Sequence, residues 1–163
     1  MDEVSIRRAV IKLAKMIMEQ NPTAKNLVLV GIKSNGEYLA KRLSECIKEG
    51  YGKKIAWCGL DVTYFKEEVN SRIISMDTLV VNVVNKTVII VDDTIFSGRT
   101  AQAAITAVLY NGRPKTIRLA VLGDCGHREV PIQADYVGKN IPLNKGEKVT
   151  VKFSEEESAV FVR

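Results

Sequence analysis

The sequence predicts one α/β domain whose central sheet is largely parallel. Through the middle of the chain, short and almost wholly apolar segments alternate with amphipathic segments of helical spacing. Nearly continuous apolar runs are typical of strands covered on both faces, as parallel strands are. A length of 163 residues suits a single domain, so we assign residues 1–163 to one unit.

The first predicted element is an amphipathic helix. Its apolar stripe, at steps of four, three and four residues, consists of Ile6, Val10, Leu13 and Ile17. Asn21 and Pro22 end this helix. Residues 26–32 then read as a buried strand, because nearly every position is apolar.

A polar loop at residues 33–36 leads into a second predicted helix. The apolar side of that helix carries Leu39, Leu43, Cys46 and Ile47. Residues 55–65 are rich in β-branched and aromatic side chains, which predicts a strand. Residues 66–75 are polar and irregular, so we expect a mobile loop there, and residues 80–84 are ambiguous between a short strand and a hairpin arm.

The strongest strand signal covers residues 86–93, where four apolar residues end in Asp92 and Asp93. A helix follows after a short loop, and its apolar residues are Ala104, Ile105, Val108 and Leu109. Residues 111–114 end that helix, and residues 117–122 form another buried strand. Short strands are expected in the remainder, at residues 135–138, 148–153 and 159–162.

Composition excludes several classes of protein. No apolar run approaches the roughly 20 residues of a membrane helix, and residues 1–5 lack the apolar core of an export signal. Three cysteines at unrelated spacings fit neither a disulfide framework nor a cysteine-rich zinc site, so a cytoplasmic location is expected. Lysine and arginine number 24 against 19 acids, a net charge of +5 that points to phosphate-bearing partners.

Chemistry is expected where the strand ending in Asp92 and Asp93 passes through a loop into a helix. Ser97, Gly98 and Thr100 offer small side chains, two hydroxyls and backbone N–H groups at a helix N-terminus, a receptor for a phosphate dianion. Adjacent carboxylates need hydroxyl donors or a cation, and a ribose diol with Mg²⁺ nearby supplies both. The alternative interpretation is an acidic turn that caps a buried strand. The segment matches neither a Walker loop nor a dinucleotide fingerprint.

Here the sequence resembles the type I phosphoribosyltransferases, whose signature is four apolar residues, two acids and a small-residue phosphate loop. Other segments, in order over nearly the whole chain, resemble one subfamily, the bifunctional pyrimidine operon attenuators and uracil phosphoribosyltransferases. These segments are residues 6–9, 30–33, 38–43, 112–114, 126–129 and 134–142. The resemblance implies the type I phosphoribosyltransferase fold, with a small hood subdomain contributed by about residues 124–145 and the N-terminal region.

The resemblance also implies a reaction. Uracil would displace pyrophosphate from phosphoribosyl pyrophosphate (PRPP) to give UMP, with Mg²⁺ bound through PRPP. The implied catalytic residues are Asp92, Asp93 and, in a flexible loop, Lys66. The residues implied to bind PRPP or UMP are Lys33, Ser34, Asn35, Gly36, Thr94, Ile95, Phe96, Ser97, Gly98, Arg99 and Thr100. The uracil base would lie against Tyr136 and be read by backbone groups of Val137.

A second activity implied by the resemblance is regulatory. In the subfamily, a homodimer or larger assembly binds the leader mRNA of the pyrimidine operon when UMP or UTP occupies the nucleotide site. The RNA contacts implied here are Lys12, Lys15, His127, Arg128 and Lys139. From the residues alone, an ordinary solvated face is the favoured interpretation of the basic stripe of the first helix, and His127 is equally a hydrogen-bonded turn histidine.

Several positions depart from the subfamily pattern. Asn35 stands in the pyrophosphate loop where arginine is usual, Lys66 replaces another arginine, and the region around it is several residues shorter. Cys125 and Gln133 stand where basic residues are usual. Two alternatives therefore stay open: a UMP-sensing RNA-binding regulator with little or no transferase activity, and a phosphoribosyltransferase that uses purines.

Overall fold

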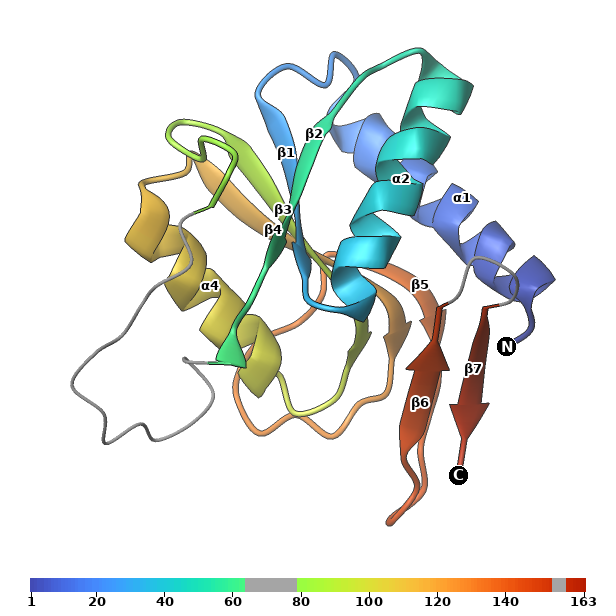
Figure 1. The fold of residues 1–163 in the computed structure, drawn as a ribbon. Helices are drawn as coiled ribbons and strands as arrows, with labels where there is room; N and C mark the ends of the chain where they lie inside the picture. Colours follow the sequence, from blue (N-terminus) through green and yellow to red (C-terminus); the bar gives the residue numbers. More distant parts are fainter. Residues whose placement is uncertain (64–78, 154–157) are drawn as a thin grey trace.

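The structure is a computed structural model that describes residues 1–63, 79–153 and 158–163. Figure 1 shows helices on both sides of a central sheet, with a separate small hairpin beside the N-terminus. In chain order the elements are α1 (Glu3–Gln20), β1 (Leu27–Ile32), α2 (Asn35–Tyr51), β2 (Ala56–Leu60), β3 (Thr87–Ile95), α4 (Arg99–Asn111), β4 (Thr116–Asp124), β5 (Tyr136–Asn140), β6 (Val149–Lys152) and β7 (Ala159–Val162).

The central sheet has five strands in the order β2-β1-β3-β4-β5, and every neighbouring pair is parallel. This confirms the predicted fold class. Because the strands are parallel, their carboxyl ends meet at one edge of the sheet, which is where open α/β sheets bind ligands. The loops that follow β1 and β3 both lie at that edge.

Each face of the sheet is covered by its own apolar cluster. Helices α1 and α2 pack on one face, against side chains such as Leu29 and Ile89. Helix α4 packs on the other face, against neighbours in the same strands such as Val30 and Ile90. All six residues of β1 are buried, as its continuous apolar run predicts.

Strand β3 is longer at its carboxyl end than the sequence suggests. It continues past Asp93 to Ile95, because Thr94 and Ile95 pair with Gly123 and Asp124 of β4. The two acidic residues therefore lie within a paired strand and not in a turn after it. Pairing with a neighbour fixes the backbone that presents their carboxylates.

Three other expectations need correction. Helix α4 buries a face rich in alanine that includes Ala101, Ala104 and Ala107, whereas Leu109 is 53% exposed, because 100° per residue carries position 109 to the opposite side. Residues 80–84 form bends and turns and no strand. Residues 33–36 are not all loop, since α2 already begins at Asn35.

The C-terminal strands β6 and β7 form an antiparallel pair, as expected for short strands there. The pair is fastened to the N-terminus: the Met1 ammonium group donates to the Val160 carbonyl oxygen at 2.6 Å, and the Val160 N–H donates to the Met1 carbonyl oxygen at 2.9 Å. Val160 itself is 5% exposed. Among the described residues, no helix has the length and apolar character needed to cross a membrane.

Candidate functional site

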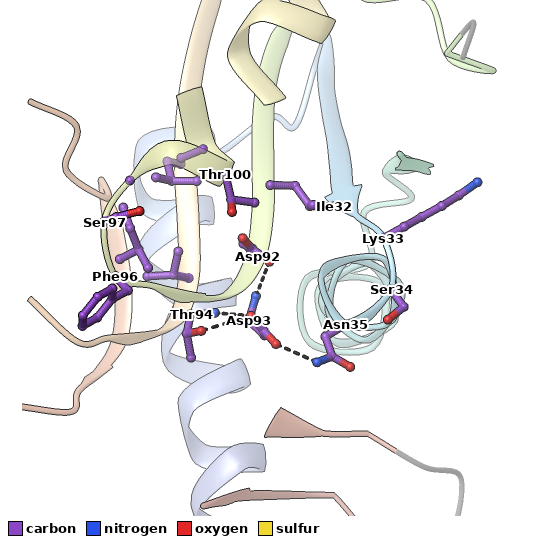
Figure 2. A pocket seen from close by; sticks show the side chains of 15 residues that line it. Ile32, Lys33, Ser34, Asn35, Asp92, Asp93, Thr94, Phe96, Ser97 and Thr100 are labelled. Atoms are coloured by element: carbon purple, nitrogen blue, oxygen red, sulfur yellow. Dashed lines mark hydrogen bonds between the residues drawn. The ribbon is translucent and has the colours of Figure 1, made fainter. Parts of the chain in front are cut away.

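A cavity of about 340 Å³ opens at the carboxyl edge of the sheet. The structure brings together there most of the residues that the sequence assigned to PRPP and UMP (Figure 2). These are Lys33, Ser34, Asn35, Asp92, Asp93, Thr94, Ile95, Phe96, Ser97, Gly98 and Thr100. The predicted phosphate loop and the predicted pyrophosphate loop therefore face one cavity.

Two of the described residues that were predicted to bind PRPP or UMP, Arg99 and Gly36, do not line this cavity. The side chain of Arg99 is 65% exposed, and its Nε donates to Glu129 at 2.5 Å. Gly36 is buried against the backbone of β3, where a Cβ atom would lie 2.4 Å from the Val91 carbonyl oxygen. Lys66 lies outside the described residues.

The cavity also has an apolar wall that the sequence did not single out. Ile32, at the end of β1, and Leu119 and Val121, in β4, contribute to its lining. These residues belong to uniform apolar runs, so nothing local distinguishes them from ordinary core residues. Only the position of each strand in the sheet shows which apolar side chains reach the cavity.

The phosphate loop places a helix N-terminus against the cavity. Gly98 precedes α4 with a φ of +87°, a backbone conformation that glycine adopts at little cost. The Ser97 hydroxyl accepts a hydrogen bond from the Arg99 N–H at 3.3 Å. The first N–H groups of a helix have no partner within it, and the helix dipole favours negative charge there. This geometry suits a phosphate group.

The two carboxylates beside the cavity are held by local hydrogen bonds. Asp93 Oδ1 accepts from the Thr94 N–H at 2.6 Å and from the Thr94 hydroxyl at 3.2 Å. Asp92 Oδ1 accepts from the Asp93 N–H at 2.9 Å. Both side chains are half-buried and line the cavity. Two fixed carboxylates can accept hydrogen bonds from the hydroxyls of a ribose.

Asn35 connects the acidic pair to the C-terminal hairpin. Its Nδ2 donates to Asp93 Oδ2 at 2.7 Å (Figure 2) and to the Val151 carbonyl oxygen, in β6, at 3.2 Å. A stacked pair of rings, Tyr38 and Phe153, lies between the same two segments, with centroids 5.2 Å apart. The sequence had no signal for this proximity, because Asn35 and Val151 are 116 positions apart.

Magnesium prefers oxygen ligands, and Asp92 and Asp93 are the residues here that could hold it. In the part of the chain that the structure describes, no group of three or more His, Cys, Asp or Glu side chains could bind a metal ion. This donor set fits an ion that takes most of its ligands from a bound pyrophosphate and from water.

Tyr136 is not at the cavity, which corrects its predicted role against the base. Its side chain is 1% exposed and packs in the cluster beneath α1, where its hydroxyl donates to Gln20 Oε1 at 2.8 Å. Side chains alternate along β5, so Val137 faces the other cluster and does not line the cavity. The tyrosine is a core residue of the α1 side.

The predicted RNA contacts fall into two groups. Lys12, Lys15 and Lys139 are exposed, and the Lys12 ammonium donates to the Gly138 carbonyl oxygen at 3.0 Å, beside Lys139 on edge strand β5. Lys15 lies 3.9 Å from Glu19 in a pair whose side chains are 68% and 63% exposed, a geometry worth little in stability.

The second group lies in the connection from β4 to β5. His127 has a φ of +58°, and its Nε2 is 2.9 Å from the Leu143 carbonyl oxygen, which matches the alternative of a hydrogen-bonded turn histidine. The Arg128 side chain, predicted as an RNA contact, is 20% exposed and pairs with Asp124 at 2.7 Å. Burial would raise the pKa of Asp124, but the hydrogen bonds from Arg128 and the Gly126 N–H lower it overall.

Cys125 does not supply the positive charge that the subfamily pattern places at its position. Its side chain is 3% exposed. Burial, followed by the nearby carboxylates of Asp124 and Asp93, raises the pKa of this thiol. It is therefore neutral near pH 7 and acts as a small apolar residue.

A parallel sheet with a carboxylate pair and a phosphate loop at its carboxyl edge defines the class of phosphoribosyl transferase proteins. The family model of the phosphoribosyl transferase domain matches residues 2–157. The chain is 44% identical to the bifunctional protein PyrR of Bacillus pumilus over 95% of this chain and 89% of that protein. It is 42% identical to that of Staphylococcus aureus over 100% and 97%. The chain belongs to the phosphoribosyl transferase family and, within it, to the bifunctional PyrR proteins.

Solved structures agree on the fold. The chain matches a hypoxanthine-guanine phosphoribosyltransferase of Bacillus anthracis with a TM-score of 0.69 and 24% identity, over 86% of this chain and 81% of that one. It matches the hypoxanthine phosphoribosyltransferase of Trypanosoma cruzi in complex with IMP with a TM-score of 0.72 and 22% identity, over 86% and 78%. At this identity the likeness establishes the fold and carries no argument on the base.

Proposed function

We propose that this protein converts uracil and PRPP to UMP and pyrophosphate, and that its nucleotide-bound form binds the leader RNA of a pyrimidine operon. The observation that carries the proposal is the cavity at which Asp92, Asp93 and the phosphate loop meet. The identity of 41–44% with bifunctional PyrR proteins over 95–100% of the chain supports both activities.

In the proposed reaction, Asp92 and Asp93 accept hydrogen bonds from the ribose hydroxyls, and the loop at Ser97–Thr100 binds the 5′-phosphate. Asp92 and Asp93 would help to hold Mg²⁺ bound with PRPP, and the ion would supply positive charge for the departing pyrophosphate. Uracil N1 forms a bond to C1′ as the bond from C1′ to pyrophosphate breaks, through a transition state with positive charge on the ribose, and the N1 proton passes to solvent. The nearby carboxylates favour that charge. The chain itself needs no nucleophile, and Lys66, which lies outside the described residues, stays a proposed catalytic residue.

The regulatory activity is proposed for a homodimer or larger assembly in the cytoplasm. Lys12, Lys15, Lys139 and His127 are exposed and are the proposed RNA contacts. Arg128 is left out of this set because its guanidinium group is engaged within the protein. UMP or UTP in the cavity is proposed to favour RNA binding.

One preparation of the full chain tests both halves of the proposal. Pyrophosphate release is measured with PRPP, Mg²⁺ and either uracil, hypoxanthine or guanine. Binding to a transcribed pyrimidine-operon leader RNA is measured with and without UMP, at a stated salt concentration. Release with uracil and UMP-dependent RNA binding support the proposal. Pyrophosphate release with hypoxanthine or guanine but not with uracil would identify the purine-using alternative. No pyrophosphate release and no RNA binding would refute the proposed function.

The geometry of Asn35 gives weight to the alternative of a sensor with weak transferase activity. Because its side chain is a neutral amide, Asn35 offers the leaving group no charge, and its Nδ2 already donates to Asp93 and to the Val151 carbonyl oxygen. We expect Asn35→Arg to raise kcat/KM for PRPP about 10-fold or more, because a charged hydrogen bond contributes about 1.5–3 kcal/mol. Steady-state pyrophosphate release measures this.

Asn35→Ala is the control, since it removes the same contacts to Asp93 and Val151 without adding a charge. We expect it to leave kcat/KM at or below the parent value. An arginine variant no faster than the alanine variant would show that position 35 does not limit the reaction.

A further inference from the structure

The connection from β4 to β5 is tied to the phosphate loop by one side chain, Arg128. Its Nη1 donates to the Phe96 carbonyl oxygen at 3.0 Å and to the Gly126 carbonyl oxygen at 3.2 Å. Its Nη2 donates to Asp124 Oδ2 at 2.7 Å, and its Nε donates to the Ile132 carbonyl oxygen at 2.8 Å. All three guanidinium nitrogens therefore bond within the protein.

Backbone and ring contacts join the same two segments. The N–H groups of Glu129 and Val130 both donate to the Ser97 carbonyl oxygen, at 2.9 and 3.3 Å. The rings of Phe96 and His127 lie 5.3 Å apart between centroids. The connection at residues 126–132 and the phosphate loop thus form one packed unit, with Arg128 at its centre.

Removing the guanidinium group would affect both segments at once. The carbonyl oxygens of Phe96 and Ile132 would each lose this donor, and the Asp124 carboxylate, 22% exposed, would lose its counter-charge. Because the positive charge already faces Asp124, it contributes little to neutralising an outside phosphate. A contact role and a positioning role therefore predict different behaviour for this residue.

We propose that Arg128 is a positioning residue that couples nucleotide binding to RNA binding and does not itself contact RNA. The inference rests on the proposed function. A phosphate bound by the N–H groups of the loop holds the Phe96 and Ser97 backbone in place. Arg128 and the two N–H groups of the connection donate to this backbone, so fixing it also fixes residues 126–132, which include the exposed His127. Bound nucleotide thereby holds this part of the RNA-facing surface in a binding conformation.

The test compares Arg128→Gln and Arg128→Lys with Lys139→Gln, which removes one charge from an exposed residue of β5. The dissociation constant for leader RNA is measured with and without UMP, over a range of salt concentrations. For both Arg128 variants, we expect the dissociation constants for RNA with and without UMP to agree within about twofold. The dependence of RNA binding on salt concentration (the salt slope) is expected to stay as in the parent protein. Lysine is expected to fail because one ammonium group cannot make all four contacts. Lys139→Gln should weaken binding equally with and without UMP and reduce the slope by about one.

The opposite pattern overturns the proposal. If Arg128→Gln lowers the salt slope by about one and Arg128→Lys restores parent binding, the residue contacts an RNA phosphate. Hydrogen exchange of the unaltered protein is an independent measurement that needs no variant to fold. UMP is expected to slow exchange of the amides at residues 126–132, and unchanged exchange would refute the coupling. If the parent protein does not bind leader RNA at all, the proposed regulatory function fails. Hydrogen exchange with and without UMP still decides whether nucleotide binding orders residues 126–132.

Discussion

Replacing Asp93 by asparagine is expected to lower the affinity for UMP and the kcat/KM for PRPP by about 10- to 100-fold. A hydrogen bond to a charged group contributes about 1.5–3 kcal/mol, and each 1.4 kcal/mol is tenfold. Asp93 is held by Thr94 and Asn35 with its carboxylate beside the cavity, so the charge is lost at a fixed position. Calorimetric titration with UMP and steady-state pyrophosphate release measure the two effects.

Glu49→Gln is the matched control, because it removes one negative charge from an exposed residue. Glu49 lies near the C-terminus of α2, at the opposite end from Asn35, which contacts Asp93. We expect its affinity for UMP to stay within twofold of the parent. Thermal unfolding of both variants separates loss of binding from loss of fold. An Asp93→Asn variant that binds UMP within threefold of the parent would contradict the assignment of the ribose site.

Replacing Gly36 by alanine is expected to destabilise the fold and to weaken nucleotide binding together. A Cβ atom at this position would lie 2.4 Å from the Val91 carbonyl oxygen and 3.1 Å from the Asp92 Cα atom. Both are backbone atoms of β3, so the strand must move to relieve the overlap. Overpacking of this kind costs about 1–3 kcal/mol, which corresponds to a fall in Tm of about 2–12 °C for a domain of this size.

The same substitution at Gly50 is the control, since it lies in the same helix and a Cβ atom there meets nothing within 4 Å. Alanine favours a helix over glycine by about 0.5–1 kcal/mol, so Gly50→Ala should keep or raise the Tm. Differential scanning calorimetry compares the pair, and UMP titration follows. Equal Tm values for the two variants would show that α2 and β3 are not in the close contact described here.

Local sequence was sufficient to predict which residues form the phosphate-binding half of the site. The apolar run, the acidic pair and the small-residue loop are consecutive, and a strand followed by a helix N-terminus places them at one edge. The structure brings Asp92, Asp93 and Ser97 to one cavity, as that order predicts. The sequence also indicated the family through the acidic pair and phosphate loop together with residues 134–142, and the match over residues 2–157 establishes it.

The residues whose predicted roles changed are those whose partners lie far along the chain. Tyr136 was placed at the base, but the alternation of β5 turns it towards Gln20, 116 positions away. Arg128 was placed at the RNA, but its guanidinium group reaches the Phe96 carbonyl oxygen, 32 positions away. Neither partner can be identified from spacing within one segment.

By itself, the sequence determined the order of the strands and helices, the parallel sheet and the ligand edge, because periodicity and local turn residues decide these over short distances. Tertiary structure alone decided which face of each element is covered and which partner each side chain meets there. The alanine face of α4, the bridge from Asn35 to Val151 and the inward turn of Arg128 all depend on this. The reason is physical: a side chain's direction follows from the pleat or helical phase of its own element, but its partner is set by how separate elements pack.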